Sequence, residues 1–129
     1  MRLCTALLLF AFTASAADKV SAPELIRMSK SKAPGFREAL IASLGDGPIK
    51  KGAAFLGEGP DFIWAIEAPS TPTLFVDRAE VGPMMHLDRN VWYRTGELKV
   101  GTSHAFYYMV NGERFGGNFN VPAYAPEAY

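Results

Sequence analysis

The stretch from Trp92 to Asn120, WYRTGELKVGTSHAFYYMVNGERFGGNFN, decides the fold. Its centre, residues 104–110, is the most strand-like segment of the chain, and Asn111-Gly112 follows it directly. Asn-Gly between two extended runs favours a type I′ turn, because both central residues tolerate a positive φ and the twist of the turn matches that of the strands. The sequence therefore predicts a β-hairpin formed by residues 104–110 and 113–116.

The aromatic residues around this hairpin predict a larger antiparallel sheet. Trp92 to Arg94 and Leu98 are typical of a preceding strand, so the C-terminal third is predicted to be a three-stranded antiparallel meander. Such a sheet needs a second layer to cover it. Within the central strand Phe106 and Tyr108 point to one face and Tyr107 to the other, so at least one of these sets is expected in the core.

Short strands separated by Gly and Pro precede this region. The segment Phe62-Ile63-Trp64-Ala65-Ile66 is apolar on both faces, which is typical of a central strand. Strands spaced about ten residues apart with turn residues between them favour a two-sheet β-sandwich. The predicted strands are 51–56, 62–67, 73–77, a weak segment at 84–87, 91–95, 105–110 and 113–115.

Two helical patterns come before the strands. Ser21-Ala22-Pro23-Glu24 is a capping box that predicts the start of a first helix. Pro34 and Gly45 bound a second helix with its apolar residues on one face. We expect these helices to form a structural arm that stands outside the sandwich, where it packs on a neighbouring domain or caps the sandwich.

The first residues are typical of a secretory signal peptide. Met1-Arg2 is positive, Leu3 to Thr13 is apolar, and Ala14-Ser15-Ala16 is a small-residue cleavage site. The apolar run is too short to span a bilayer, and the alternative is a buried N-terminal helix. The prediction is a signal peptide at residues 1–16 and a secreted or periplasmic protein. Cys4, the single cysteine, would be removed with it, so no disulfide is expected.

Composition indicates one small globular domain and excludes some partners. The chain has 129 residues, 49% of them hydrophobic and 20% charged. With 13 basic and 13 acidic residues it has no strongly basic balance, so neither nucleic acid nor an anionic membrane surface is an expected partner.

The sequence offers no catalytic, metal or cofactor site. Gly101-Thr102-Ser103-His104-Ala105 lacks the second glycine of a nucleophile elbow. Ser103 and His104 are neighbours on a predicted strand, so their side chains point to opposite faces and cannot act as nucleophile and base. With only His86 and His104 and no cysteine in the mature chain, no metal-ligand spacing is present.

The aromatic residues are the remaining candidates for binding. Exposed rings beside polar groups suit the apolar faces of sugars, whereas burial in the core is the alternative fate of any of them. The predicted binding residues are Trp92, Tyr93, Tyr107 and Asn111.

Part of this chain resembles a known type of domain. The run Phe106-Tyr107-Tyr108-x-Val110-Asn111-Gly112, followed by Asn118-Phe119-Asn120, resembles the end of the early-set immunoglobulin-like domains that precede the catalytic domains of glycogen-branching and debranching enzymes. More closely, the chain from residue 21 resembles the N-terminal region of secreted enterochelin-esterase-like proteins, in which segments such as Pro23 to Ile26 and Pro34 to Leu40 lead into the sandwich.

The resemblance implies a domain organisation. It predicts a helical arm at 17–46, an immunoglobulin-like β-sandwich at 47–120, and a linker at 121–129. In the similar proteins an α/β-hydrolase domain with a serine, histidine and acidic triad follows. The chain is therefore expected to be a truncated protein or a separately encoded accessory domain, whose C-terminal hydrolase domain is missing from the sequence.

Two functions follow from the resemblance. One is a non-catalytic accessory domain of a secreted serine esterase, which shapes the site for a siderophore-like ester or forms a homodimer contact. It predicts an exposed apolar patch on the arm or on one sheet face. The other is a free-standing carbohydrate-binding module of the glycogen-binding type, which predicts two or three coplanar exposed rings on one face.

Overall fold

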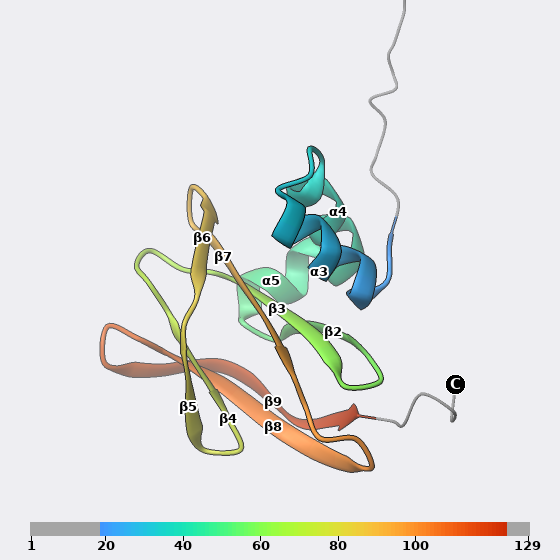
Figure 1. Cartoon of the computed structure of the whole chain (residues 1–129). Helices are drawn as coiled ribbons and strands as arrows, with labels where there is room; N and C mark the ends of the chain where they lie inside the picture. Colours follow the sequence, from blue (N-terminus) through green and yellow to red (C-terminus); the bar gives the residue numbers. More distant parts are fainter. Residues whose placement is uncertain (1–18, 124–129) are drawn as a thin grey trace, which may run out of the picture.

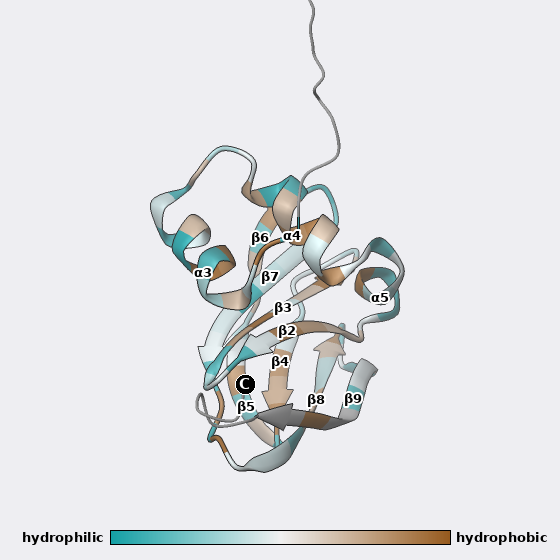
Figure 2. Cartoon of the chain, turned by 90° about the vertical axis from the view of Figure 1, so that its right-hand side faces the viewer, coloured by the Kyte–Doolittle hydropathy of each residue, from teal (hydrophilic) through white to brown (hydrophobic). Residues whose placement is uncertain are grey.

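The computed structural model describes residues 19–123, without the side chains of residues 119, 120, 122 and 123. Within this range the chain forms three layers: a group of helices, a first sheet beneath them, and a second sheet on the far side of the first (Figures 1 and 2). The predicted signal peptide and residues 124–129 lie outside the described residues.

Two four-stranded antiparallel sheets make up the predicted sandwich, which is confirmed. The first sheet has the order β2 (Ala54–Glu58), β3 (Asp61–Glu67), β7 (Val91–Glu97) and β6 (Met85–Asp88). The second has the order β5 (Ala79–Pro83), β4 (Thr73–Val76), β8 (Thr102–Val110) and β9 (Glu113–Ala123).

Strand β3 is buried on both faces, as the sequence predicts. Phe62, Trp64 and Ile66 point into the core between the two sheets, where Phe106 and Tyr108 of β8 meet them. The intervening residues, Ile63 and Ala65, point the other way and join a second core beneath the helices. Because side chains alternate along a strand, one apolar segment supplies both cores.

Three helices form the outer layer: α3 (Ala22–Ser31), α4 (Phe36–Leu44) and α5 (Asp46–Lys51). The Ser21 hydroxyl accepts the Glu24 N–H at 3.3 Å, which confirms the predicted cap of α3. The Glu24 carboxylate pairs with Arg27 instead of returning to the Ser21 backbone.

Of the two places expected for the helical arm, the structure shows the one in which it caps the sandwich. Leu25 of α3 and Leu40 of α4 are fully buried in the second core, together with Ile63 of β3. Figure 2 shows the helices stacked on the first sheet. The physical reason is that the outward face of β3 is as apolar as its inward face, so it needs a cover.

Several boundaries also differ from the prediction. The turn cluster at residues 45–48 opens helix α5, so the helical part extends past residue 46 and β2 begins only at Ala54. Strand β5 was not predicted. The short return strand predicted at 113–115 is β9, which continues to Ala123 and so includes the first residues of the predicted linker.

The predicted three-stranded meander is wrong in its pairing. The hairpin of β8 and β9 is present, with φ of 53° at Asn111 and 80° at Gly112, as a type I′ turn requires. However, β7 pairs with β3 and β6 in the other sheet. The chain crosses between the sheets after β7, where buried Leu98 donates its N–H to the Pro60 carbonyl at 2.8 Å.

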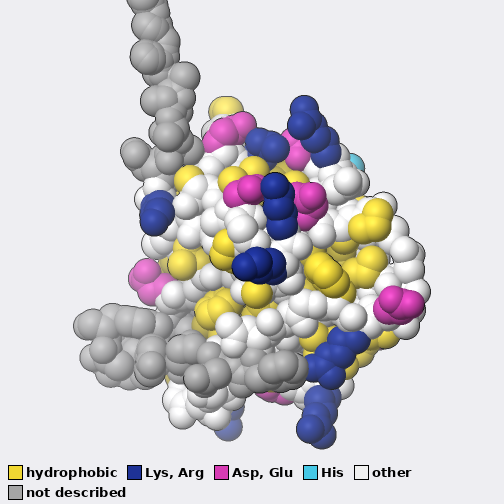
Figure 3. All heavy atoms as spheres, turned by 180° about the vertical axis from the view of Figure 1, so that it is seen from behind, with side chains coloured by type: hydrophobic (Ala, Val, Ile, Leu, Met, Phe, Trp, Pro, Cys, Tyr) yellow, Lys and Arg dark blue, Asp and Glu magenta, His cyan; other side chains and the backbone are white. Residues whose placement is uncertain are grey.

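One face of the molecule shows how its charged side chains are distributed. On the face in Figure 3, basic and acidic side chains are interspersed with hydrophobic ones. Within residues 19–123, none of the helices has both the length and the apolar character needed to cross a bilayer. In the same range no group of three or more His, Cys, Asp or Glu side chains is placed to hold a metal ion.

Because the helices share a core with β3, we expect them to unfold together with the sandwich. Leu40→Ala should lower the free energy of unfolding by about 2–5 kcal/mol, since it leaves a cavity at a fully buried site. The measurement is urea unfolding followed by the fluorescence of Trp64, which lies in the core between the sheets. Ile26→Ala is the control, since Ile26 is half-buried and outside both cores. An unchanged transition in Leu40→Ala would contradict the shared core.

Candidate functional site

Trp92 and Tyr93, two of the predicted binding residues, lie on opposite faces of β7. The Trp92 indole N–H donates to the Ala68 carbonyl at 3.0 Å, and its ring packs against the core between the sheets. Tyr93 packs under the helices, with its ring edge-on to Phe36 at 5.1 Å between centroids. Both rings are half-buried, and they do not share a surface.

Tyr107 lies on the outer face of the second sheet. Its ring is parallel to that of Phe75 on β4, with 5.1 Å between centroids and 6° between planes. From β9 the Arg114 guanidinium lies over Tyr107, 4.2 Å from the ring centroid. Because β4 and β9 flank β8 on opposite sides, Tyr107 lies between a phenyl ring and a guanidinium group. These three side chains, Phe75, Tyr107 and Arg114, are called the aromatic row.

Asn111 occupies the turn between β8 and β9 and borders a cleft. Its side-chain oxygen accepts a hydrogen bond from the Ser70 hydroxyl at 2.8 Å, which ties the hairpin to the loop between β3 and β4. Asn111 is the only one of the four predicted residues that lines this cleft. Trp92 supports it indirectly, because Ala68, the acceptor of its indole N–H, is one of the lining residues.

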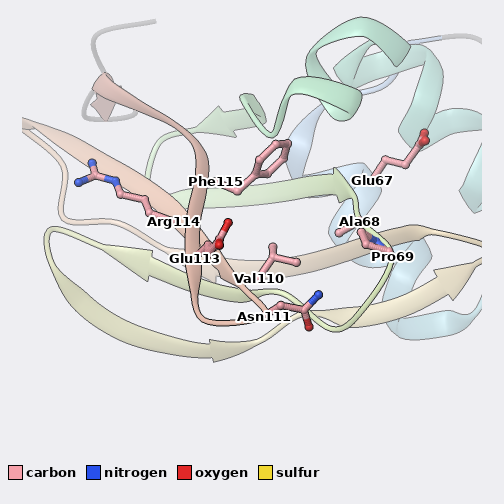
Figure 4. Close-up of a pocket in the computed structure, with 8 residues that line it drawn as sticks. All are labelled: Glu67, Ala68, Pro69, Val110, Asn111, Glu113, Arg114 and Phe115. Carbon is pink, nitrogen blue, oxygen red and sulfur yellow. The ribbon is translucent and has the colours of Figure 1, made fainter.

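The cleft has a volume of about 390 Å³ and lies where the hairpin and the end of β3 meet (Figure 4). Its apolar lining residues are Ala68, Pro69, Val110 and Phe115, and its polar ones are Glu67, Asn111, Glu113 and Arg114. An apolar wall with carboxylate and amide residues in its lining suits a ligand that has both apolar faces and hydroxyl groups.

Three glycines allow the close backbone contact that positions Phe115 in the cleft. The Phe115 ring lies over Gly52, where an added Cβ would come within 2.8 Å of it. At Gly116 an added Cβ would lie 2.5 Å from the Gly52 carbonyl oxygen, and the Gly117 N–H donates to the same oxygen at 2.7 Å. This close approach joins the end of α5 to β9 and leaves Phe115 39% exposed.

Glu67, Glu113 and Phe115 line the cleft but are not among the residues predicted from the sequence. Alternation along the hairpin could have placed Phe115, because it pairs with Tyr108 and Glu113 pairs with Val110. No signal in the sequence brings Glu67 next to the hairpin, since β3 and β8 belong to different sheets.

His104 and Asp77 form a pair at the start of β8. His104 Nδ1 lies 2.6 Å from an Asp77 carboxylate oxygen, and Nε2 lies 2.8 Å from the Lys99 carbonyl. Burial alone would lower the pKa of His104, but these two acceptors outweigh it and raise the pKa. Burial would likewise raise the pKa of the Asp77 carboxyl, but its hydrogen bonds with His104 and the Ala105 N–H lower it overall.

This pair has a structural role, because both ring nitrogens of His104 already face an acceptor. Ser103 is exposed, whereas His104 is 8% exposed, so the two side chains point apart as expected for neighbours on a strand. Asp77 also accepts the Ala105 N–H at 3.0 Å, so the pair fixes the loop between β4 and β5 against β8.

The pair predicts a pH dependence of stability. His104 has a raised pKa in the folded chain, so its contribution is full below about pH 6.5 and is lost as the pH rises through the folded value. Asp77 has a lowered pKa, so its contribution is present above about pH 3.9 and is lost as the pH falls through the folded value. The melting temperature should therefore fall as the pH is raised from mildly acidic to alkaline.

Thermal unfolding across this pH range is the measurement. Asp77→Asn should make the melting temperature depend less on pH, because the substitution removes the negative charge that pairs with His104. The amide oxygen can still accept the Ala105 N–H. His86→Gln is the control and should keep the fall, since His86 is exposed and its ring contacts the Arg89 carbonyl. If the melting temperature of Asp77→Asn still falls with rising pH as steeply as that of the unchanged protein, the proposed role of the pair is contradicted.

Comparison of the chain with protein-family models, with curated proteins and with solved structures found no match.

Proposed function

We propose that the sandwich is of the immunoglobulin-like type. An immunoglobulin-like domain orders its strands A-B-E-D in one sheet and C-F-G in the other. When the strands are lettered by their order in the chain, the first sheet, β2-β3-β7-β6, has the order A-B-E-D. In the second sheet β4, β8 and β9 have the order C-F-G, with β5 added beside C. This strand order supports the type more strongly than any single residue does.

The position of His104 also supports the immunoglobulin-like type. Many immunoglobulin-like domains have a tyrosine near the start of strand F whose hydroxyl bonds to the backbone a few residues upstream. Here His104 has that place, since it lies near the start of β8 and bonds to the Lys99 carbonyl at 2.8 Å.

We propose that the chain is an exported, non-catalytic accessory domain of an enterochelin-esterase-like serine esterase. The observation that carries this is the uneven cover of the sandwich. The helices cover the outer face of the first sheet, whereas no described element covers the outer face of the second (Figure 2). On that second face lie Phe75, Tyr107 and Met109, all half-buried. Such a face suits contact with an α/β-hydrolase domain.

The genomic sequence beyond the codon for Tyr129 tests the parent enzyme class. The proposal expects a coding region, in frame or adjacent, for an α/β-hydrolase with a Gly-x-Ser-x-Gly elbow. The chain alone should hydrolyse a chromogenic short-chain ester no faster than buffer does. Turnover by the chain that is lost in Ser103→Ala would contradict a non-catalytic role.

Binding to that hydrolase domain tests the docking face. Phe75→Ser should weaken the association about tenfold or more, because it removes a central ring of the contact. Met85→Ser is the control, since Met85 is 56% exposed but lies on β6 of the other sheet. Both variants are first checked for an unchanged melting temperature. If they then bind the hydrolase domain with equal affinity, the second sheet is not the contact surface.

The cleft favours a second function, carbohydrate binding. Phe115 presents an exposed ring in a cleft whose lining also includes Asn111, Glu113 and Glu67, residue types that can exchange hydrogen bonds with sugar hydroxyls (Figure 4). The aromatic row does not offer such a platform, because Phe75 and Arg114 cover the Tyr107 ring.

Titration with a soluble glucan oligosaccharide tests the cleft. If it binds a glycan, Phe115→Ala should weaken binding about tenfold, since stacking on one ring contributes on the order of 1 kcal/mol or more. Val81→Ala is the control, because Val81 is also an exposed apolar residue but lies on β5. Binding that is equally strong in Phe115→Ala would exclude this cleft as the glycan site.

A further inference from the structure

We propose that Arg94 keeps the free edge of β5 from accepting a strand of a second copy of this chain. Strand β5 is the last strand of the second sheet, and it passes directly into β6 of the first sheet along one side of the sandwich (Figure 1). An edge strand presents unpaired backbone groups to which another strand can add. Neither proposed function uses this edge.

Arg94 reaches β5 from the other sheet. It lies on β7 directly opposite Trp64 of β3, which points into the core between the sheets. Residues directly opposite each other share a face, so the Arg94 side chain is directed toward the second sheet. Its two terminal nitrogens donate to the Pro83 carbonyl at 2.8 Å and to the Val81 carbonyl at 3.3 Å. One side chain of the first sheet therefore occupies two carbonyls of β5.

These two carbonyls are acceptors that an added strand would need. Residues two apart on a strand present their carbonyls to the same side, and Arg94 occupies the carbonyls of both Val81 and Pro83. Pro83 also has no backbone N–H to donate. Strand β5 pairs Phe75 with Glu80 and Leu74 with Gly82, so Val81 is the extra residue of a bulge, which twists the edge further. This part of the edge is therefore closed to a new strand.

Gly82 lies between the two carbonyls and makes room for the guanidinium. An added Cβ at this position would lie 3.1 Å from both terminal nitrogens of Arg94 and 3.2 Å from its central carbon. The φ of Gly82 is 145°, which side chains rarely adopt. Glycine thus allows the guanidinium to lie directly against the edge strand.

Stability alone does not account for an arginine at this position. The Arg94 Nε is buried and has no hydrogen-bond partner in the part of the chain that the structure describes. A buried donor without a partner lowers stability, and an apolar side chain facing the core would avoid that loss. What the guanidinium adds is the pair of bonds to β5, and their consequence is a protected edge.

Sedimentation equilibrium of the whole chain tests this role. Arg94→Ala should self-associate about tenfold or more strongly than the unchanged chain, because two freed carbonyls become acceptors for a strand. In the associated variant, amide hydrogen exchange should be slowed in β5 but not in β2, which is an edge strand of the other sheet. Arg27→Ala is the matched control, since it removes the same charge from an exposed arginine that pairs with Glu24 on α3.

Arg94→Lys separates the effect of the carbonyl bonds from that of the charge. Lysine keeps the charge but has no planar fork to reach both carbonyls, so this variant should associate to an intermediate degree. Its long side chain is retained, so it gives the comparison even where Arg94→Ala does not fold, which the melting temperature of each variant shows. Association no stronger than that of Arg27→Ala, protection of β2 instead of β5, or a lysine that fully replaces Arg94 would each overturn the proposal.

Discussion

The structure depends on one strand that must be covered on both faces. Side chains of β3 alternate between two cores, with Trp64 between the sheets and Ile63 under the helices, and both are almost completely buried. A sandwich of two sheets covers only one face of each strand, so the other face of β3 requires a third layer. The helices supply it, and the order of helices, first sheet and second sheet follows from this requirement.

The same layering decides where a ligand or partner can bind. Helices cover the outer face of the first sheet, so a partner can reach the sandwich itself at the outer face of the second sheet and at the end formed by the β8–β9 hairpin. The aromatic row occupies the first surface, and the cleft beside Phe115 occupies the second.

Local sequence predicts the elements of this chain better than their partners. The Ser21 cap, the Asn111-Gly112 turn and the doubly apolar β3 each follow from short-range chemistry, and the structure contains all three. The pairing of β7 with β3 depends on a crossover that apolar alternation does not encode, so the predicted meander is wrong. The four predicted binding residues are separated for the same reason, since Trp92 and Tyr107 lie in different sheets. Phe115 lines the cleft because Gly52 and Gly116 approach closely, and contact between such distant segments is not visible in a single sequence.

Native-state amide hydrogen exchange tests the central claim most directly. If β3 joins the helices and the sandwich into one cooperative unit, the slowest amides of α4, β3 and β8 should exchange with the same opening free energy, equal to that of global unfolding. Their opening free energies should also fall in parallel as denaturant is added. Exchange of the α4 amides at a much lower opening free energy, with β3 and β8 still protected, would contradict the account, because the helices would then detach from a sandwich that is stable without them.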